Sequence, residues 1–159
     1  MCRSLHAGVV LGLGLTLTRG VAAQLPQTPV LTLEAATRTA VAAEAEATRN
    51  RWNVVIAVVD AGGHLVHLRR MDGAHIGSVA VAQEKAKTAA LFRRPTKVFA
   101  DRVAAGETAP LRLPGVIPIE GGIPLLVAKQ VIGAIGVSGA TAAQDGQIAE
   151  AGAKALAAP

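Results

Sequence analysis

The residues best suited to chemistry are Glu84, Lys85 and Thr88, which share a predicted helix. A double-glycine loop at Gly121 and Gly122 is the second candidate. Glu84 and Thr88 are one turn apart on the same helix face, and Lys85 lies beside them. An ammonium group and a hydroxyl suit an anionic ligand, and the N–H groups of a glycine loop can also bind an acidic group. We therefore predict a cleft in which Lys85 and Thr88 face Gly121 and Gly122. The alternative is an ordinary exposed polar face.

Short catalytic signatures are missing from the chain. Neither Ser78 nor Ser138 lies in a G-x-S-x-G elbow, and neither a P-loop nor a G-x-G-x-x-G opening a helix is present. His64 and His67 are three residues apart on a predicted strand, so they face opposite sides and cannot chelate one metal. The only cysteine is Cys2, which excludes disulfides, a thiolate nucleophile and an iron–sulfur cluster from residues 3–159. These observations argue against most enzyme classes that are recognised by short motifs.

Two β-hairpins should carry the candidate site. Residues 123–128 and 131–138 are apolar runs of strand length, and the glycines inside the second run indicate close packing against the backbone. Residues 54–59 and 64–70 flank a turn at residues 60–63, which predicts a second hairpin. Helices are predicted over residues 33–51, 78–92, 97–105 and 142–157. With a short strand near Val116, this order predicts an α+β fold around a central antiparallel sheet of about five strands.

Helical spacing assigns Leu33, Ala36, Ala40, Ala43 and Ala47 to the apolar stripe of the first helix. Small alanine side chains there would let the helix pack close to the sheet. A capping box begins at Thr141 and predicts the start of the last helix.

The N-terminus carries the pattern of a signal peptide over residues 1–23. Arg3 precedes an apolar core, Val9 to Thr18, and the small residues before Gln24 suit a signal peptidase. A membrane anchor is the alternative, but the apolar core is about half of the ~20 residues that span a bilayer. We expect a cleaved, periplasmic or secreted protein with an extended leader at residues 24–31. Residues 32–159 should then form one domain.

Basic residues exceed acidic ones, giving a net charge of +5 for the full chain. Many of them lie between Arg69 and Arg102, but only Trp52, Phe92 and Phe99 are aromatic. Nucleic-acid binding normally combines basic residues with aromatic stacking, so we expect no nucleic-acid partner. The basic residues predict either a solvated face or a pocket for a small anion.

Five segments resemble the family of small haem-binding or haem-degrading domains that includes GlcG, the HbpS proteins and the C-terminal domain of PduO. They are Val58 to Leu65, Arg70 to Ala74, Lys85 to Ala89, Gly121 to Leu125 and Gly133 to Gly139. The likeness extends over residues 32–156. It implies a PAS- or profilin-like fold, a homo-oligomer, and haem or a related tetrapyrrole bound between subunits. Some secreted relatives sequester haem or iron and signal to an envelope sensor. The family usually turns its last hairpin with Asp-Gly, where this chain has Ala128-Lys129.

The resemblance makes His75 the first candidate for a haem-iron ligand, because it directly follows the Arg70 to Ala74 motif and imidazole commonly ligates haem. The alternative is a surface histidine without function. Arg70 could pair with a haem propionate. Met71 is expected in the core, and His67 is a second, weaker candidate for the iron ligand. The complete set of candidate ligand-binding residues is Arg70, Met71, Asp72, Lys85, Thr88, Gly121 and Gly122.

Three functions remain open at this point. The first is an exported protein that binds haem or a related tetrapyrrole without established turnover. The second is a cofactor-independent enzyme that acts on a small acidic metabolite through Lys85, Thr88 and the glycine loop. The third is an accessory protein for an envelope sensor or transporter. The few aromatic residues would leave a haem site to rely on aliphatic contacts and on a second subunit.

Overall fold

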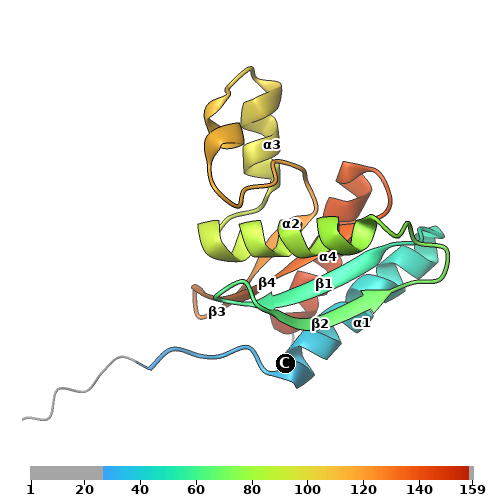
Figure 1. Cartoon of the computed structure of the whole chain (residues 1–159). Coiled ribbons are helices and arrows are strands. Elements are labelled where there is room, and N and C mark those ends of the chain that lie inside the picture. The colour runs from blue at the N-terminus through green and yellow to red at the C-terminus, as the bar shows by residue number, and fades with distance from the viewer. Residues whose placement is uncertain (1–26, 158–159) are drawn as a thin grey trace, which may run out of the picture.

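The computed structural model describes residues 27–157, so the predicted signal peptide lies outside the described residues (Figure 1). Four α-helices, α1 to α4, and four β-strands, β1 to β4, make up an α+β domain, with one short 3-10 helix at Ala109–Arg112. Residues 27–31 of the predicted leader run to α1 without helix or strand, and Leu31 at their end is buried. None of the helices between residues 27 and 157 is long and apolar enough to cross a membrane.

The sheet contains two antiparallel hairpins laid side by side. The strands are β1 (Val55–Asp60), β2 (Leu65–Arg70), β3 (Gly122–Val127) and β4 (Gln130–Ser138), in the spatial order β2-β1-β4-β3. The prediction of about five strands is wrong, because Val116 lies in a loop. Pro110, Pro114 and Pro118 around it lack the N–H donors that a further strand would need.

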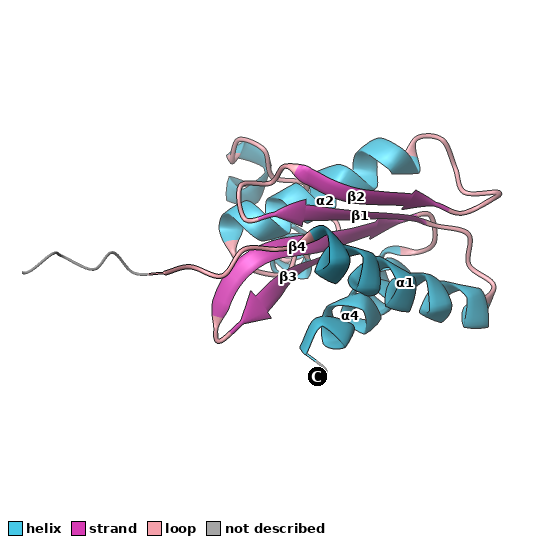
Figure 2. Ribbon diagram, turned by 90° about the horizontal axis from the view of Figure 1, so that it is seen from below, coloured by secondary structure: helices cyan, strands magenta, loops and turns pink. Residues whose placement is uncertain are grey.

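Helices cover both faces of the sheet. In Figure 2, α1 (Leu33–Asn50) and α4 (Ala142–Ala157) lie together on one side of the strands and α2 (Ser78–Phe92) lies on the other. Strand β1 is buried on both faces, since its alternate side chains pack under α1 and α4 or under α2. The predicted alanine stripe of α1 is confirmed except for Leu33, which is exposed; its buried members are Ala36, Ala40, Ala43 and Ala47.

Helix α2 lies very close to strand β4 because Gly136 has no side chain. A Cβ atom built on Gly136 would lie 2.1 Å from the carbonyl oxygen of Ala82 and 2.4 Å from the amide nitrogen of Ala86. The glycine predicted to mark close packing therefore does so. This contact fixes the helix that carries Lys85 and Thr88 against the centre of the sheet.

Helix α3 (Lys97–Ala104) and the 3-10 helix project away from the sheet (Figure 1). Phe92, the last residue of α2, packs edge-on against Phe99 with ring centroids 5.4 Å apart. The guanidinium of Arg94 lies 5.9 Å from the centre of the Phe99 ring. These contacts hold the projecting part on the C-terminal end of α2.

The turn between β3 and β4 has positive φ angles at two residues that carry side chains, Ala128 (48°) and Lys129 (67°). These angles are those of a type I′ turn, which ordinarily uses Asn-Gly or Asp-Gly. The hairpin therefore keeps the two-residue turn geometry despite its unusual residues, and it holds backbone strain there.

The double variant Ala128→Asn/Lys129→Gly should be more stable than the wild type. It should raise the free energy of unfolding by about 1–2 kcal/mol, because the left-handed conformation costs about that much for a residue with a Cβ atom. Urea denaturation followed by circular dichroism measures the change. A less stable variant would show that the turn does not adopt these angles in solution.

Candidate functional site

Lys85 lies inside the protein, where it is only 1% exposed. Its ammonium group donates hydrogen bonds to a carboxylate oxygen of Asp145 (2.7 Å) and to the carbonyl oxygen of Val137 (3.0 Å). Burial raises the pKa of the Asp145 carboxyl, and the neighbouring Lys85 ammonium opposes that rise. The pair links α2 to β4 and α4, so Lys85 already has an anionic partner within the chain.

The double-glycine loop packs directly on this buried pair. A Cβ atom on Gly121 would lie 2.8 Å from the ammonium nitrogen of Lys85, and one on Gly122 would lie 2.3 Å from the Lys85 carbonyl oxygen. The N–H of Gly122 donates to the hydroxyl of Thr96 (2.9 Å), and the Gly121 carbonyl accepts from the Val137 N–H (2.9 Å). The loop does face Lys85, as predicted, but the expectation of a free Gly122 N–H is wrong.

Thr88 has a structural bonding pattern as well. Its hydroxyl donates to the carbonyl of Gly115 (3.1 Å) and accepts from the N–H of Ile117 (3.0 Å), and its side chain is fully buried. It therefore holds the proline-containing loop against α2. Lys85 and Thr88 therefore lie neither in the predicted open cleft nor on the alternative exposed polar face, and only Glu84 of the three is exposed.

A hollow of about 190 Å³ lies on the outer side of the glycine loop, between α3 and α4. Lys97 within it forms an ion pair with Asp101 (2.6 Å) and lies 4.0 Å from Glu120. Its lining residues are Pro95, Lys97, Val98, Asp101, Glu120, Gly121, Gly122, Ile123, Gly146 and Glu150. Lys85 is not among them, so this hollow does not unite the lysine with the glycines.

Arg70, Met71 and Asp72 form a second group at the end of β2. They line a hollow of about 440 Å³ together with Glu44, Asn53 and Arg69. Within the hollow Arg69 donates to Glu44 over 2.8 Å, whereas Arg70 and Asp72 form no ion pair with any residue between 27 and 157. Met71 packs against the core cluster under α1 and α4, as expected. The predicted site residues therefore lie in two places.

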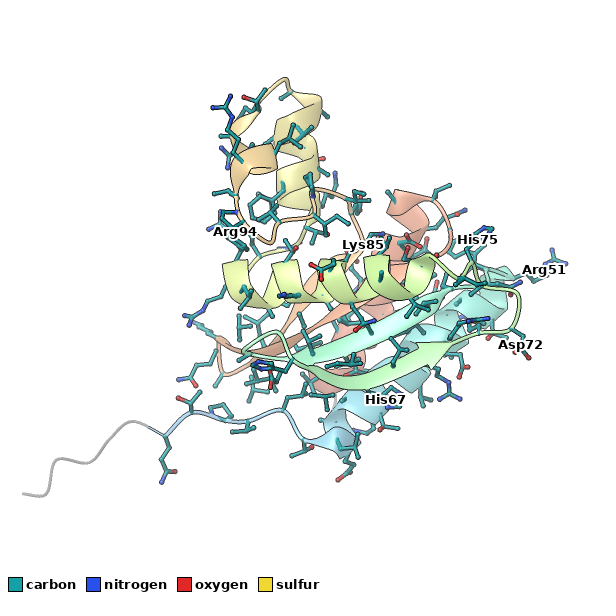
Figure 3. All side chains as sticks on the ribbon, in the orientation of Figure 1. Arg51, His67, Asp72, His75, Lys85 and Arg94 are labelled. Atoms are coloured by element: carbon teal, nitrogen blue, oxygen red, sulfur yellow. The ribbon has the colours of Figure 1, made fainter. Side chains whose placement is uncertain are left out.

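His75 lies in the turn between β2 and α2, three residues after Asp72. Figure 3 shows it at the N-terminal end of α2, with Asp72 nearby and Lys85 further along the helix. The His75 side chain is exposed, and its imidazole has no hydrogen-bond partner in the described part of the chain. Its ring nitrogens are therefore available to an external group.

His67 has a different environment. It is paired with Val58 across the β1–β2 ladder, so it faces α1 and α4 (Figure 3). Its Nε2 atom is buried without a hydrogen-bond partner among the described residues. No group of three or more His, Cys, Asp or Glu side chains within residues 27–157 is arranged to hold a metal ion by itself. Haem iron does not require such a group, because a single protein side chain can be its ligand.

Sequence reasoning missed two residues of the buried network, Asp145 as the partner of Lys85 and Thr96 as the partner of Gly122. Asp145 lies in the first turn of α4, where an acidic residue is common without any partner. The capping box that begins α4 is present, since Thr141 and Gln144 exchange hydrogen bonds. No local pattern distinguishes Asp145 from a residue that only favours the helix start.

Comparisons with known proteins agree on one family. Residues 31–154 match the model of the family described as haem degrading protein HbpS-like. Protein GlcG of Escherichia coli K12 is 47% identical over 109 residues, which cover 69% of this chain and 81% of GlcG. A double mutant of HbpS from Streptomyces reticuli superimposes with a TM-score of 0.75 and 36% identity, over 89% of this chain and 97% of that one.

A complex of PduOC with haem is also similar, with a TM-score of 0.72 and 29% identity over 80% of this chain and 95% of that one. The sequence match covers most of the described residues, and the structural matches have the same α+β arrangement. The chain therefore belongs to the HbpS-like family.

Proposed function

We propose that this protein binds haem or a related tetrapyrrole, and that it does so as an exported homo-oligomer without established turnover. The observation that carries the proposal is the structural match to PduOC, which was solved in complex with haem. The family match over residues 31–154 supports the same function. The sheet flanked by helices also suits the PAS- or profilin-like fold that the resemblance implies.

The residues at the end of β2 fit such a ligand. His75 offers an exposed imidazole, and Arg70 offers a guanidinium without an ion-pair partner in the described chain. Imidazole nitrogen is a common axial ligand of haem iron, and a guanidinium suits a propionate carboxylate. When bound, haem supplies an iron centre whose reactivity depends on its axial ligand. The protein's own part is to bind the iron through His75 and to orient a propionate through Arg70.

The exposure of His75 and of its neighbour Ile76 supports a binding site that a second subunit completes. Ile76, next to His75, is 78% exposed although it is strongly apolar. A porphyrin held by His75 would also have the exposed apolar side chain of Ile76 within the same turn to contact. We propose that a second copy completes the site, since the chain provides few aromatic residues for stacking.

Export forms the cellular part of the proposal. The signal-like segment at residues 1–23 supports a periplasmic or secreted protein that receives its ligand after export. A role as the haem-carrying partner of an envelope sensor or transporter is compatible with a periplasmic or secreted location. The alternative of a cofactor-independent enzyme has less support, because Lys85 and Thr88 are bonded inside the domain.

A haemin titration followed by absorbance in the Soret region tests the proposal. Wild-type protein should give a saturable band at stoichiometric haem. Arg70→Gln should weaken haem binding about tenfold, because a charge-assisted hydrogen bond to a propionate is lost. Arg112→Gln, which changes an exposed arginine in the 3-10 helix that projects from the sheet, is the matched control and should bind haem like the wild type. A titration without a saturable band would refute haem binding.

A further inference from the structure

A third hollow, of about 430 Å³, lies beside the hairpin turn between β3 and β4. Three separate parts of the chain meet there: the extended segment before α1, the C-terminal end of α2, and the hairpin itself. Its lining residues are Thr28, Arg93, Leu126, Lys129, Gln130 and Val131. Two of these are cationic and none is acidic, which distinguishes this hollow from those at the glycine loop and at the end of β2.

The two cations of the hollow have no anionic partner among residues 27–157. Other basic residues nearby are engaged: Lys97 pairs with Asp101, and Arg94 donates to the Phe92 carbonyl and lies over the ring of Phe99. Arg93 and Lys129 form no such contact, and the Thr28 hydroxyl and Gln130 amide have no hydrogen-bond partner in the described residues. The hollow is therefore lined by four exposed residues whose side-chain donors have no partner among the described residues.

Arg93 and Lys129 also share an unusual backbone conformation. Arg93 and Lys129 both have positive φ angles, 53° and 67°, at positions where glycine would be less strained. Arg93 ends α2 and Lys129 lies in the two-residue turn between β3 and β4, and both kinds of place commonly need a positive φ. The two residues come from different elements and line the same hollow.

We propose that this hollow binds a small organic dicarboxylate. Arg93 and Lys129 would each hold a carboxylate, and an anion between them would relieve their mutual repulsion. Thr28 and Gln130 would donate further hydrogen bonds, and Leu126 and Val131 would contact the aliphatic carbons between the two acid groups. The volume lies within the range of small-molecule sites.

This site goes beyond the proposed haem binding and is separate from it. Arg94, the neighbour of Arg93, lies at the opposite end of α2 from His75 and Arg51 in Figure 3. A dicarboxylate bound near the hairpin would therefore not need haem, and haem at His75 would not need the dicarboxylate.

Calorimetric titration of the protein with succinate at low ionic strength tests the proposal. We expect saturable binding that is about tenfold or more weaker in Arg93→Gln and in Lys129→Gln, and lost in the double variant. Arg51→Gln is the control, because Arg51 is also an exposed arginine with positive φ after a helix (φ 58°). Amide chemical shifts should change at Arg93 and at residues 129–131.

Several outcomes would overturn the inference. They are an absence of saturable binding, an unchanged affinity in the double variant, or an equal loss in Arg51→Gln. Inorganic phosphate provides a second titration: tighter binding of phosphate than succinate at the same residues would overturn the dicarboxylate class. Succinate should still bind after the protein is saturated with haemin, whereas displacement by haemin would show that the hollow is part of the haem site.

Discussion

Replacing Lys85 by Met should lower the free energy of unfolding by about 3–5 kcal/mol, because it leaves the buried Asp145 carboxyl without its partner. The two side chains are 2% and 3% exposed, so water cannot replace the lost interaction. The effect should be large for a fold of this size, since ordinary domains are stable by only about 5–15 kcal/mol. Urea denaturation followed by circular dichroism measures the change.

Lys87→Met is the matched control, because Lys87 is a partly exposed lysine on the same helix with no ion pair in the described chain. It should change the stability by no more than about 0.5 kcal/mol. The double variant Lys85→Met/Asp145→Leu should recover much of the loss, since both buried charges are then removed together. Equal stability of the Lys85→Met and Lys87→Met proteins would mean that Lys85 is not buried as described.

Gly136→Ala should lower the free energy of unfolding by about 3 kcal/mol, because the added methyl group overlaps the backbone of α2. Its Cβ atom would lie within 2.4 Å of two backbone atoms, which cannot move without shifting the whole helix. A shift of α2 would also disturb the Lys85–Asp145 pair. Thermal or urea unfolding of the purified variant gives the change.

Gly77→Ala is the control for this second substitution. A Cβ atom on Gly77 meets nothing within 4 Å, and its φ of −61° suits any residue. This variant should be about as stable as the wild type. Similar stability of Gly136→Ala and Gly77→Ala would show that α2 does not press on β4.

The sequence predicted those parts of the fold that are determined by local patterns of apolar residues, alanine and glycine. Alternating and continuous apolar runs predicted both hairpins, because strands buried on one or both faces need such residues. The alanine stripe of α1 and the glycine at position 136 predicted close packing of helices on the sheet. The expected strand near Val116 failed because the prolines around it prevent a regular hydrogen-bond ladder.

The arrangement of the polar residues could not be predicted in the same way. Lys85 and Thr88 give the helix a polar side in the sequence. That pattern is the same whether the side faces water, a ligand or a buried carboxylate. The difference depends on Asp145, which is 60 positions further along the chain and reaches Lys85 only after β4 and α4 are in place. By contrast, Arg70, Met71 and Asp72 are adjacent in sequence and needed only the end of β2 to be found together.

The most direct test of the account concerns the axial ligand of haem. The absorbance spectrum of the stoichiometric haemin complex should change in His75→Ala, with loss of the histidine-ligated Soret band. Added imidazole should restore that band in the variant, because the free base can occupy the vacated position. His64→Ala, which removes another exposed histidine, should leave the spectrum unchanged. A His75→Ala complex with the wild-type spectrum would contradict the assignment of the haem site to the end of β2.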